Sequence, residues 1–211
     1  MLPAADDEVF VEGEPALLLA RGERAWRELV SACGLAALRR PRLRFVVSSW
    51  RRGGHRFDLD NLVDPVLGAV SAPAGDRQSV WATVEIGPKP GVAISEQTPP
   101  AAPTDATTVH LAGPPQRSLR TIERLAELVD HMQLGADEPC ACALTLGADT
   151  RGLVFGFEGP IKPTIDALWP LLGGVAHAPA DHRIQDLRVT TDATRMGISV
   201  ALWLLDTEAR S

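Results

Sequence analysis

The sequence predicts an α+β fold in which a β-α-β-α-β-β unit occurs twice in tandem and the two copies pair as an intrachain pseudo-dimer. Predicted strands and helices follow the same order in both halves of the 211-residue chain. A segment rich in Pro and Ala, residues 97–106, separates the halves and has the composition of a linker. Blocks of similar residues also recur in the same order, which defines units at residues 1–96 and 107–211.

Hydrophobic periodicity and runs of β-branched residues predict the elements of each unit. In the first unit they are a strand at Val9–Val11, a helix at about residues 16–38, a strand at Leu43–Ser48, a helix from Asn61 to about Val70, and strands at Val80–Ile86 and Val92–Ser95. In the second unit they are a strand at Val109–Leu111, a helix at residues 117–133, a strand at Cys140–Leu146, a helix at Pro160–Leu172, and strands at Ile184–Val189 and Ile198–Leu205.

Three blocks of the first unit can be laid over the second. Val9 to Pro15 matches Val109 to Pro115 at an offset of 100, Leu43 to Asn61 matches Ala141 to Gly159 at an offset of 98, and Asp76 to Val84 matches Asp181 to Val189 at an offset of 105. The three blocks occur in the same order in both halves, and each covers the corresponding predicted elements. This favours a duplication over a coincidence.

Composition indicates a protein that is neither a membrane protein nor a generic nucleic-acid coat. The net charge is −6, which disfavours unspecific binding to a polyanion. No apolar run is long enough to span a bilayer, and the first residues lack the order of a signal peptide. Cys33, Cys140 and Cys142 have no zinc-ligand spacing. We therefore expect a cytoplasmic protein without a membrane partner.

The stretch Asp58-Leu59-Asp60-Asn61 is the main candidate for a functional site. In an extended segment residues i and i+2 point the same way, so Asp58 and Asp60 would project together ahead of a helix capped by Asn61. Neighbouring carboxylates repel each other unless a cation offsets the repulsion, and hard oxygen ligands suit Mg²⁺ or Mn²⁺. The alternative interpretation is a turn followed by a helix cap.

A basic stripe runs into this acidic motif. Residues 39–56 contain seven Arg and no acid, namely Arg39, Arg40, Arg42, Arg44, Arg51, Arg52 and Arg56. Arg beside a metal site indicates phosphate recognition. A solvated face that balances acids elsewhere explains the stripe equally well.

The order of these motifs in the first half resembles the RusA family of Holliday-junction resolvases. The shared order is a strand ending at a Pro, a helix, a strand, a basic run, Asp-x-Asp-Asn, a helix and a later Asp. Here these are Val9–Pro15, residues 16–38, Leu43–Ser48, Arg51–Arg56, Asp58–Asn61, Leu62–Val70 and Asp76. The resemblance covers the first half fully and the second half by the order of its elements more than by residues.

The resemblance implies a fold, a cofactor and a substrate class. Family members are small α+β proteins that act as homodimers on branched DNA and need Mg²⁺ or Mn²⁺. By resemblance, the catalytic and metal-binding residues are Asp58, Asp60 and Asp76, and the residues that hold flanking phosphates are Arg51, Arg52 and Arg56. A tandem duplication would place the family's dimer within one chain.

The sequence departs from the family pattern in both halves. The family usually has a Lys four residues after the second Asp, where the first half has Asp64 and the second half has Lys162. The second half has Gly156 in place of the first carboxylate, and it keeps Glu158 and Asp181 as degenerate counterparts. We therefore expect one active site per chain at most.

Three functional interpretations follow. The first is a divergent metal-dependent endonuclease acting on branched or structured DNA, with a nick as its product. The second is a catalytically inactive RusA-like binding or scaffolding protein that works through a protein or nucleic-acid partner. In the third, the two halves do not pair within one chain. The chain is then a homodimer rather than a monomer, and dimerisation brings two intact first halves together.

Overall fold

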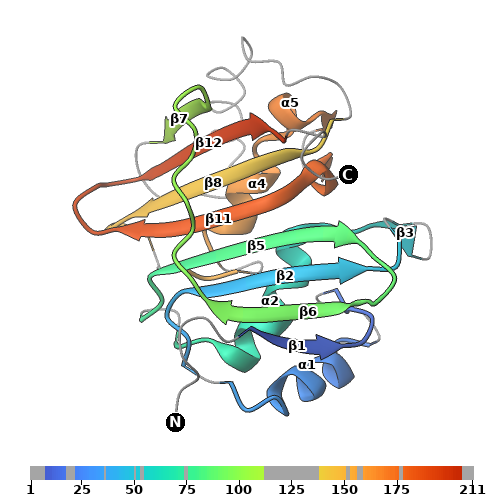
Figure 1. The fold of residues 1–211 in the computed structure, drawn as a ribbon. Helices are drawn as coiled ribbons and strands as arrows, with labels where there is room; N and C mark the ends of the chain where they lie inside the picture. The colour runs from blue at the N-terminus through green and yellow to red at the C-terminus, as the bar shows by residue number, and fades with distance from the viewer. Residues whose placement is uncertain are drawn as a thin grey trace.

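The computed structural model shows an α+β fold built on one mixed eight-stranded sheet (Figure 1). It describes residues 8–17, 22–35, 37–49, 51–52, 55–73, 76–111, 138–150, 153–155, 159–175 and 178–205. The strands of the large sheet are β1 (Val9–Glu12), β2 (Pro41–Val47), β5 (Ser79–Ile86), β6 (Gly91–Glu96), β7 (Thr107–Leu111), β8 (Cys140–Gly147), β11 (Ile184–Asp192) and β12 (Ile198–Leu204). The helices are α1 (Glu23–Ser31), α2 (Leu59–Val70), α4 (Ile161–Asp166), α5 (Trp169–Leu172) and the 3₁₀ helix η1 (Asp181–Arg183).

The order of strands across the sheet is β1-β6-β2-β5-β11-β8-β12-β7. The first four strands come from residues before 97 and the last four from residues after 106. Within each group the outer three strands are antiparallel, and the strand at the centre of the sheet is parallel to its neighbour. β5 and β11 pair antiparallel in the middle and join the two groups into one sheet.

The helices cover one face of this sheet, and the core lies between the two layers (Figure 1). Leu43, Phe45 and Val47 of β2 are fully buried and alternate with Arg42 and Arg44, because successive side chains of a strand point to opposite faces. The apolar stripe of α2 meets this buried row, and its core residues are Leu59, Leu62, Val63, Val66, Leu67 and Val70. α2 thereby packs against β2, β5 and also β11.

The opposite face of the sheet has no helix over it in the described part of the chain. The linker predicted at residues 97–106 has no helix or strand, and it crosses this face from β6 to β7 (Figure 1). Arg188 of β11 holds it there by donating to the carbonyl oxygens of Pro100 at 3.1 Å and Ala101 at 3.0 Å. The linker is therefore fixed to the sheet surface along this part of its path.

Most predicted strands are confirmed within two residues, whereas the helices differ more. The helix expected at residues 16–38 is the shorter α1, and Gly34 beyond its end has a φ of 74°, a conformation typical of a helix terminus. The helix expected at Pro160–Leu172 is two short helices, because Pro170 lacks an N–H and cannot continue α4. The helix predicted at residues 117–133 lies outside the described residues.

Two short antiparallel strand pairs lie apart from the large sheet in the described part of the chain. The Arg-rich segment forms a small antiparallel pair of β3 (Arg51–Arg52) with β4 (His55–Arg56). A second pair joins β9 (Gly174–Val175) to β10 (Ala178–Pro179). Among the described residues, no helix has the length and apolar character needed to cross a membrane.

Candidate functional site: a carboxylate and lysine cluster

Asp58 and Asp60 lie at the start of α2, but not in the way the sequence suggested. Asp58 has extended backbone angles and is the N-cap residue, so the prediction that Asn61 caps the helix is wrong. Asp60 lies in the first helical turn and is 6 % exposed. Asn61 donates from Nδ2 to Oδ2 of Asp58 at 3.2 Å. The amide thus orients the Asp58 carboxylate.

Two residues from the other half of the chain complete the cluster. Lys162, the second residue of α4, places its Nζ 3.2 Å from Oδ2 of Asp60 and 3.5 Å from Oδ1 of Asp166. Asp181, the first residue of η1, is 8 % exposed and hydrogen-bonds with the Asp58 side chain. Residues about a hundred positions apart in the sequence are therefore side by side.

The contact between Asp58 and Asp181 requires a shared proton. Burial, together with the negative charges of Asp58 and Asp60, raises the pKa of Asp181 to about 8. Burial and the Asp60 charge also raise the pKa of Asp58, while a hydrogen bond from Asp181 favours its ionised form. Near neutral pH, protonated Asp181 therefore donates to an ionised Asp58.

Lys162 supplies the permanent positive charge of the cluster. Burial alone would lower its pKa, but the carboxylates of Asp60, Asp166 and Asp181 outweigh this and raise the pKa of Lys162 to about 12. Its side chain is only 14 % exposed. The ammonium group remains charged across the physiological range and balances the buried Asp60.

The other predicted site residues are not part of this cluster or are not described. Asp76 is exposed, and its backbone carbonyl accepts a hydrogen bond from Arg39. Arg51, Arg52 and Arg56 lie on β3 and β4 with side chains outside the described part of the structure, and Glu158 lies outside the described residues altogether.

Sequence reasoning found every main member of the cluster but not their grouping. Lys162 and Asp181 were identified as degenerate second-half counterparts, whereas the structure places them against Asp58 and Asp60. The overlay contained the signal, because Lys162 and Asp181 occupy the positions of Asp64 and Asp76. Asp166, which lies one helical turn after Lys162, was not singled out.

The chemistry of the cluster fits a hard divalent cation. Asp58 and Asp181 are oxygen donors held in contact despite their repulsion, and a cation could replace the proton that now relieves it. The described residues contain no group of three His, Cys, Asp or Glu already arranged around a metal position. Metal binding would therefore involve loss of the shared proton rather than entry into a preformed cage.

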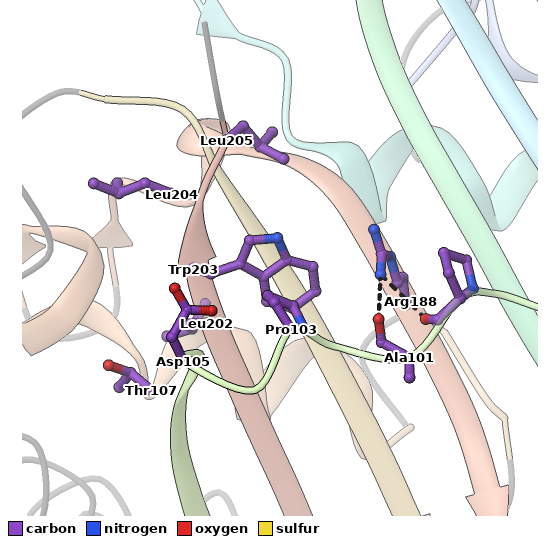
Figure 2. Close-up of a pocket in the computed structure, with 10 residues that line it drawn as sticks. Ala101, Pro103, Asp105, Thr107, Arg188, Leu202, Trp203, Leu204 and Leu205 are labelled. Atoms are coloured by element: carbon purple, nitrogen blue, oxygen red, sulfur yellow. Dashed lines mark hydrogen bonds between the residues drawn. The ribbon is translucent and has the colours of Figure 1, made fainter. Parts of the chain in front are cut away.

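A separate groove lies on the open face of the sheet. It is lined by the linker residues Ala101, Pro103 and Asp105 and by Arg188 and Trp203 of the sheet (Figure 2). None of the four residues Asp58, Asp60, Lys162 and Asp181 lines it. The groove and the carboxylate cluster are distinct features.

Comparison with known proteins adds no family assignment. No family model matches the chain, and no curated protein matches it.

Proposed function

We propose that this protein is a divalent-cation-dependent endonuclease that acts on branched or structured DNA through one composite active site per chain. The observation that carries the proposal is the contact of Asp58 and Asp60 with Asp181 and Lys162 across the two halves. Holding three carboxylates together in a largely buried position costs stability, so a structural role alone gives no reason for it. A cluster of oxygen donors beside a fixed cation suits phosphodiester hydrolysis.

We also propose that the two halves are a tandem duplication forming an intrachain pseudo-dimer. Counted from either edge of the sheet, the strands follow one another in the same chain order (first, fourth, second and third of each half), and neighbouring strands pair in the same directions. At the centre, Ala82 of β5 is opposite Leu187 of β11, and the flanking pairs are Trp81 with Arg188 and Thr83 with Asp186. At the sequence offset of 105, Trp81 corresponds to Asp186 and Thr83 corresponds to Arg188. The two flanking pairs are therefore equivalent to each other. A local two-fold axis between Ala82 and Leu187 accounts for both the offset and the register.

The sheet register also refines the sequence overlay. Leu43 is opposite Ala82 in the first half, and Cys142 is opposite Leu187 in the second. These strands therefore correspond at an offset of 99 rather than 98. The helices keep the offset of 98, because the buried Val63 and Leu67 then match the buried Ile161 and Ile165. The offset therefore differs by one residue between the strands and the helices. For this reason a single offset of 98 aligns Leu43–Asn61 with Ala141–Gly159 only approximately.

The residues of the cluster have distinct tasks in this proposal. A bound divalent cation would lower the pKa of a water molecule and stabilise charge on the phosphodiester. Asp58 and Asp181 would donate oxygen ligands, and Asn61 would keep Asp58 oriented. Lys162 is too basic to accept a proton at neutral pH, so it would act as a fixed positive charge beside the phosphate. A single site predicts a nick rather than paired cuts.

Metal binding is the first test of this proposal. We expect the native chain to bind Mn²⁺ in calorimetry at roughly micromolar to low-millimolar affinity, with proton release because the Asp58–Asp181 proton is displaced. Asp58→Asn and Asp181→Asn should each abolish or strongly weaken binding, because each removes a proposed oxygen ligand. Asp76→Asn is the matched control, and it should bind like the native chain.

A nicking assay on branched DNA then tests catalysis. We expect cleavage of one strand that requires Mg²⁺ or Mn²⁺ and is lost in Asp58→Asn, because that substitution removes a proposed metal ligand. Failure of the native chain to bind metal would contradict the endonuclease proposal. It would support the second candidate, an inactive binding or scaffolding protein, which is favoured by the present neutralisation of Asp60 by Lys162.

A further inference from the structure

The open face of the sheet carries a row of guanidinium and indole groups across its central strands. Trp81 of β5 is opposite Arg42 of β2 on one side and Arg188 of β11 on the other. The Arg42 guanidinium lies 3.6 Å from the centre of the Trp81 ring, and that of Arg188 lies 5.8 Å away. Arg44 follows on the same face of β2, since it is two residues after Arg42.

The guanidinium groups of Arg188 and Arg44 form hydrogen bonds and ion pairs with acceptors of the protein itself. Arg188 donates to Asp186, with a shortest distance of 2.7 Å, and to the two linker carbonyls of Pro100 and Ala101 (Figure 2). Arg44 pairs with Glu8 at 2.8 Å and Glu85 at 3.3 Å. The Arg44 pairs lie on the surface, where such pairs contribute little stability and exchange readily.

Arg42 differs from both neighbours. Among the described residues it has no carboxylate within ion-pair distance, and its hydrogen bond to the Leu43 carbonyl oxygen is long at 3.4 Å. Burial lowers the pKa of Arg42 to about 10, with Asp186 opposing and Arg44 adding to the lowering. A guanidinium that lies over an indole keeps its five N–H donors in its own plane, directed away from the ring. Most of these donors therefore remain available to an external acceptor.

We propose that Arg42, with Arg44 beside it, binds backbone phosphates of a nucleic acid on the open face of the sheet, opposite the carboxylate cluster. The planar fork of Arg matches a pair of phosphate oxygens. Arg42 occupies one face of the Trp81 ring at 3.6 Å and the Arg188 guanidinium lies 5.8 Å from the ring centre, which restricts base stacking and favours recognition of the backbone. An open sheet face with charges in a row along β2 fits an extended chain better than a small enclosed anion.

This second surface does not depend on metal binding at the carboxylate cluster, so it can be tested in EDTA. The measurement is fluorescence anisotropy of a labelled oligonucleotide at several salt concentrations. We expect Arg42→Met to weaken binding about tenfold and to reduce the salt slope by about one. Arg24→Met removes the same charge from an exposed position on α1, where the side chain is 92 % exposed, and should change affinity less than twofold.

Two companion measurements keep the test decisive. Arg42→Lys retains the charge without the planar fork and should give intermediate affinity, and thermal unfolding of each variant shows that the fold is intact. Equal effects of Arg42→Met and Arg24→Met would overturn the proposal. Complete displacement of the oligonucleotide by inorganic phosphate at the same phosphate concentration would also overturn it, in favour of a small-anion site.

Discussion

The Asp181→Asn variant is expected to be more stable than the native chain at pH 8. In the folded protein the pKa of Asp181 is raised from 3.8 to about 8 by burial and by the charges of Asp58 and Asp60. The unfolded chain loses this proton near pH 4, whereas the folded chain keeps it to about pH 8. Folding therefore becomes less favourable as the pH rises through this window. An Asn side chain can still donate to Asp58 and carries no charge.

The expected gain is large for a single substitution. Each pKa unit corresponds to about 1.4 kcal/mol, and we expect about 2–3 kcal/mol of this cost to disappear at pH 8. In a protein of this size, that is an increase of about 5–10 °C in the unfolding temperature. Near pH 4 the difference between the native chain and the variant should be much smaller, because Asp181 is protonated in the folded state and still about half protonated in the unfolded state.

Thermal unfolding between pH 4 and 8 gives the comparison directly. Asp76→Asn provides the matched control, since Asp76 occupies the corresponding sequence position in the first half and is exposed. Its unfolding temperature should follow that of the native chain at every pH. An Asp181→Asn protein that is no more stable than native at pH 8 would show that the two carboxylates are not held in contact. A gain in stability together with loss of Mn²⁺ binding would fit a site kept for function at the expense of stability.

The strands were predictable because apolar and polar residues alternate along them, and because they are rich in β-branched residues. Both features indicate a strand with one buried face. Leu43, Phe45 and Val47 face the core and Arg42 and Arg44 face outward, which is the pattern of a strand with one covered face. The order of strands in the sheet was not predictable from the same pattern. It depends on the pairing of β5 with β11, and alternation does not specify the partner of a strand.

The helices show where local signals compete. Pro170 divides a continuous apolar pattern into α4 and α5, because the missing N–H outweighs periodicity. At the first helix, Asn61 is a good cap by residue type, but Asp58 takes that position and Asn61 hydrogen-bonds to it. A cap depends on where the first turn forms, and two Asp and one Asn in four residues leave several starting points.

The candidate site shows a different limit. Residue types indicated Asp58 and Asp60 as a pair of carboxylates needing compensation by a cation. In the fold, their hydrogen-bonding partners Lys162 and Asp181 lie more than a hundred residues away in the sequence. Sequence spacing within one half cannot reveal a partner supplied by the other half. The assignment of Asp76 followed the order of motifs along the chain, whereas contact in the fold follows the central strand pairing. Asp181 consequently meets Asp58, and Asp76 remains at the surface.

Lys162→Met should destabilise the protein strongly at neutral pH. The substitution keeps an unbranched side chain of similar length but removes the ammonium group that lies 3.2 Å from Asp60. Asp60 is 6 % exposed, and a buried charge that loses its partner costs about 3–5 kcal/mol. We expect a decrease of about 10 °C in the unfolding temperature at pH 7.

A double-mutant cycle identifies the cause of this loss. In the Asp60→Asn background, removal of Lys162 should cost about 1 kcal/mol or less, because Asp166 at 3.5 Å is then the remaining partner. Lys89→Met is the control, since Lys89 is the other lysine of the chain and lies exposed between β5 and β6. Equal costs in the native and Asp60→Asn backgrounds would mean that Lys162 contributes packing alone. A strong dependence on Asp60 would instead establish that the two halves are held together by charges within one composite site.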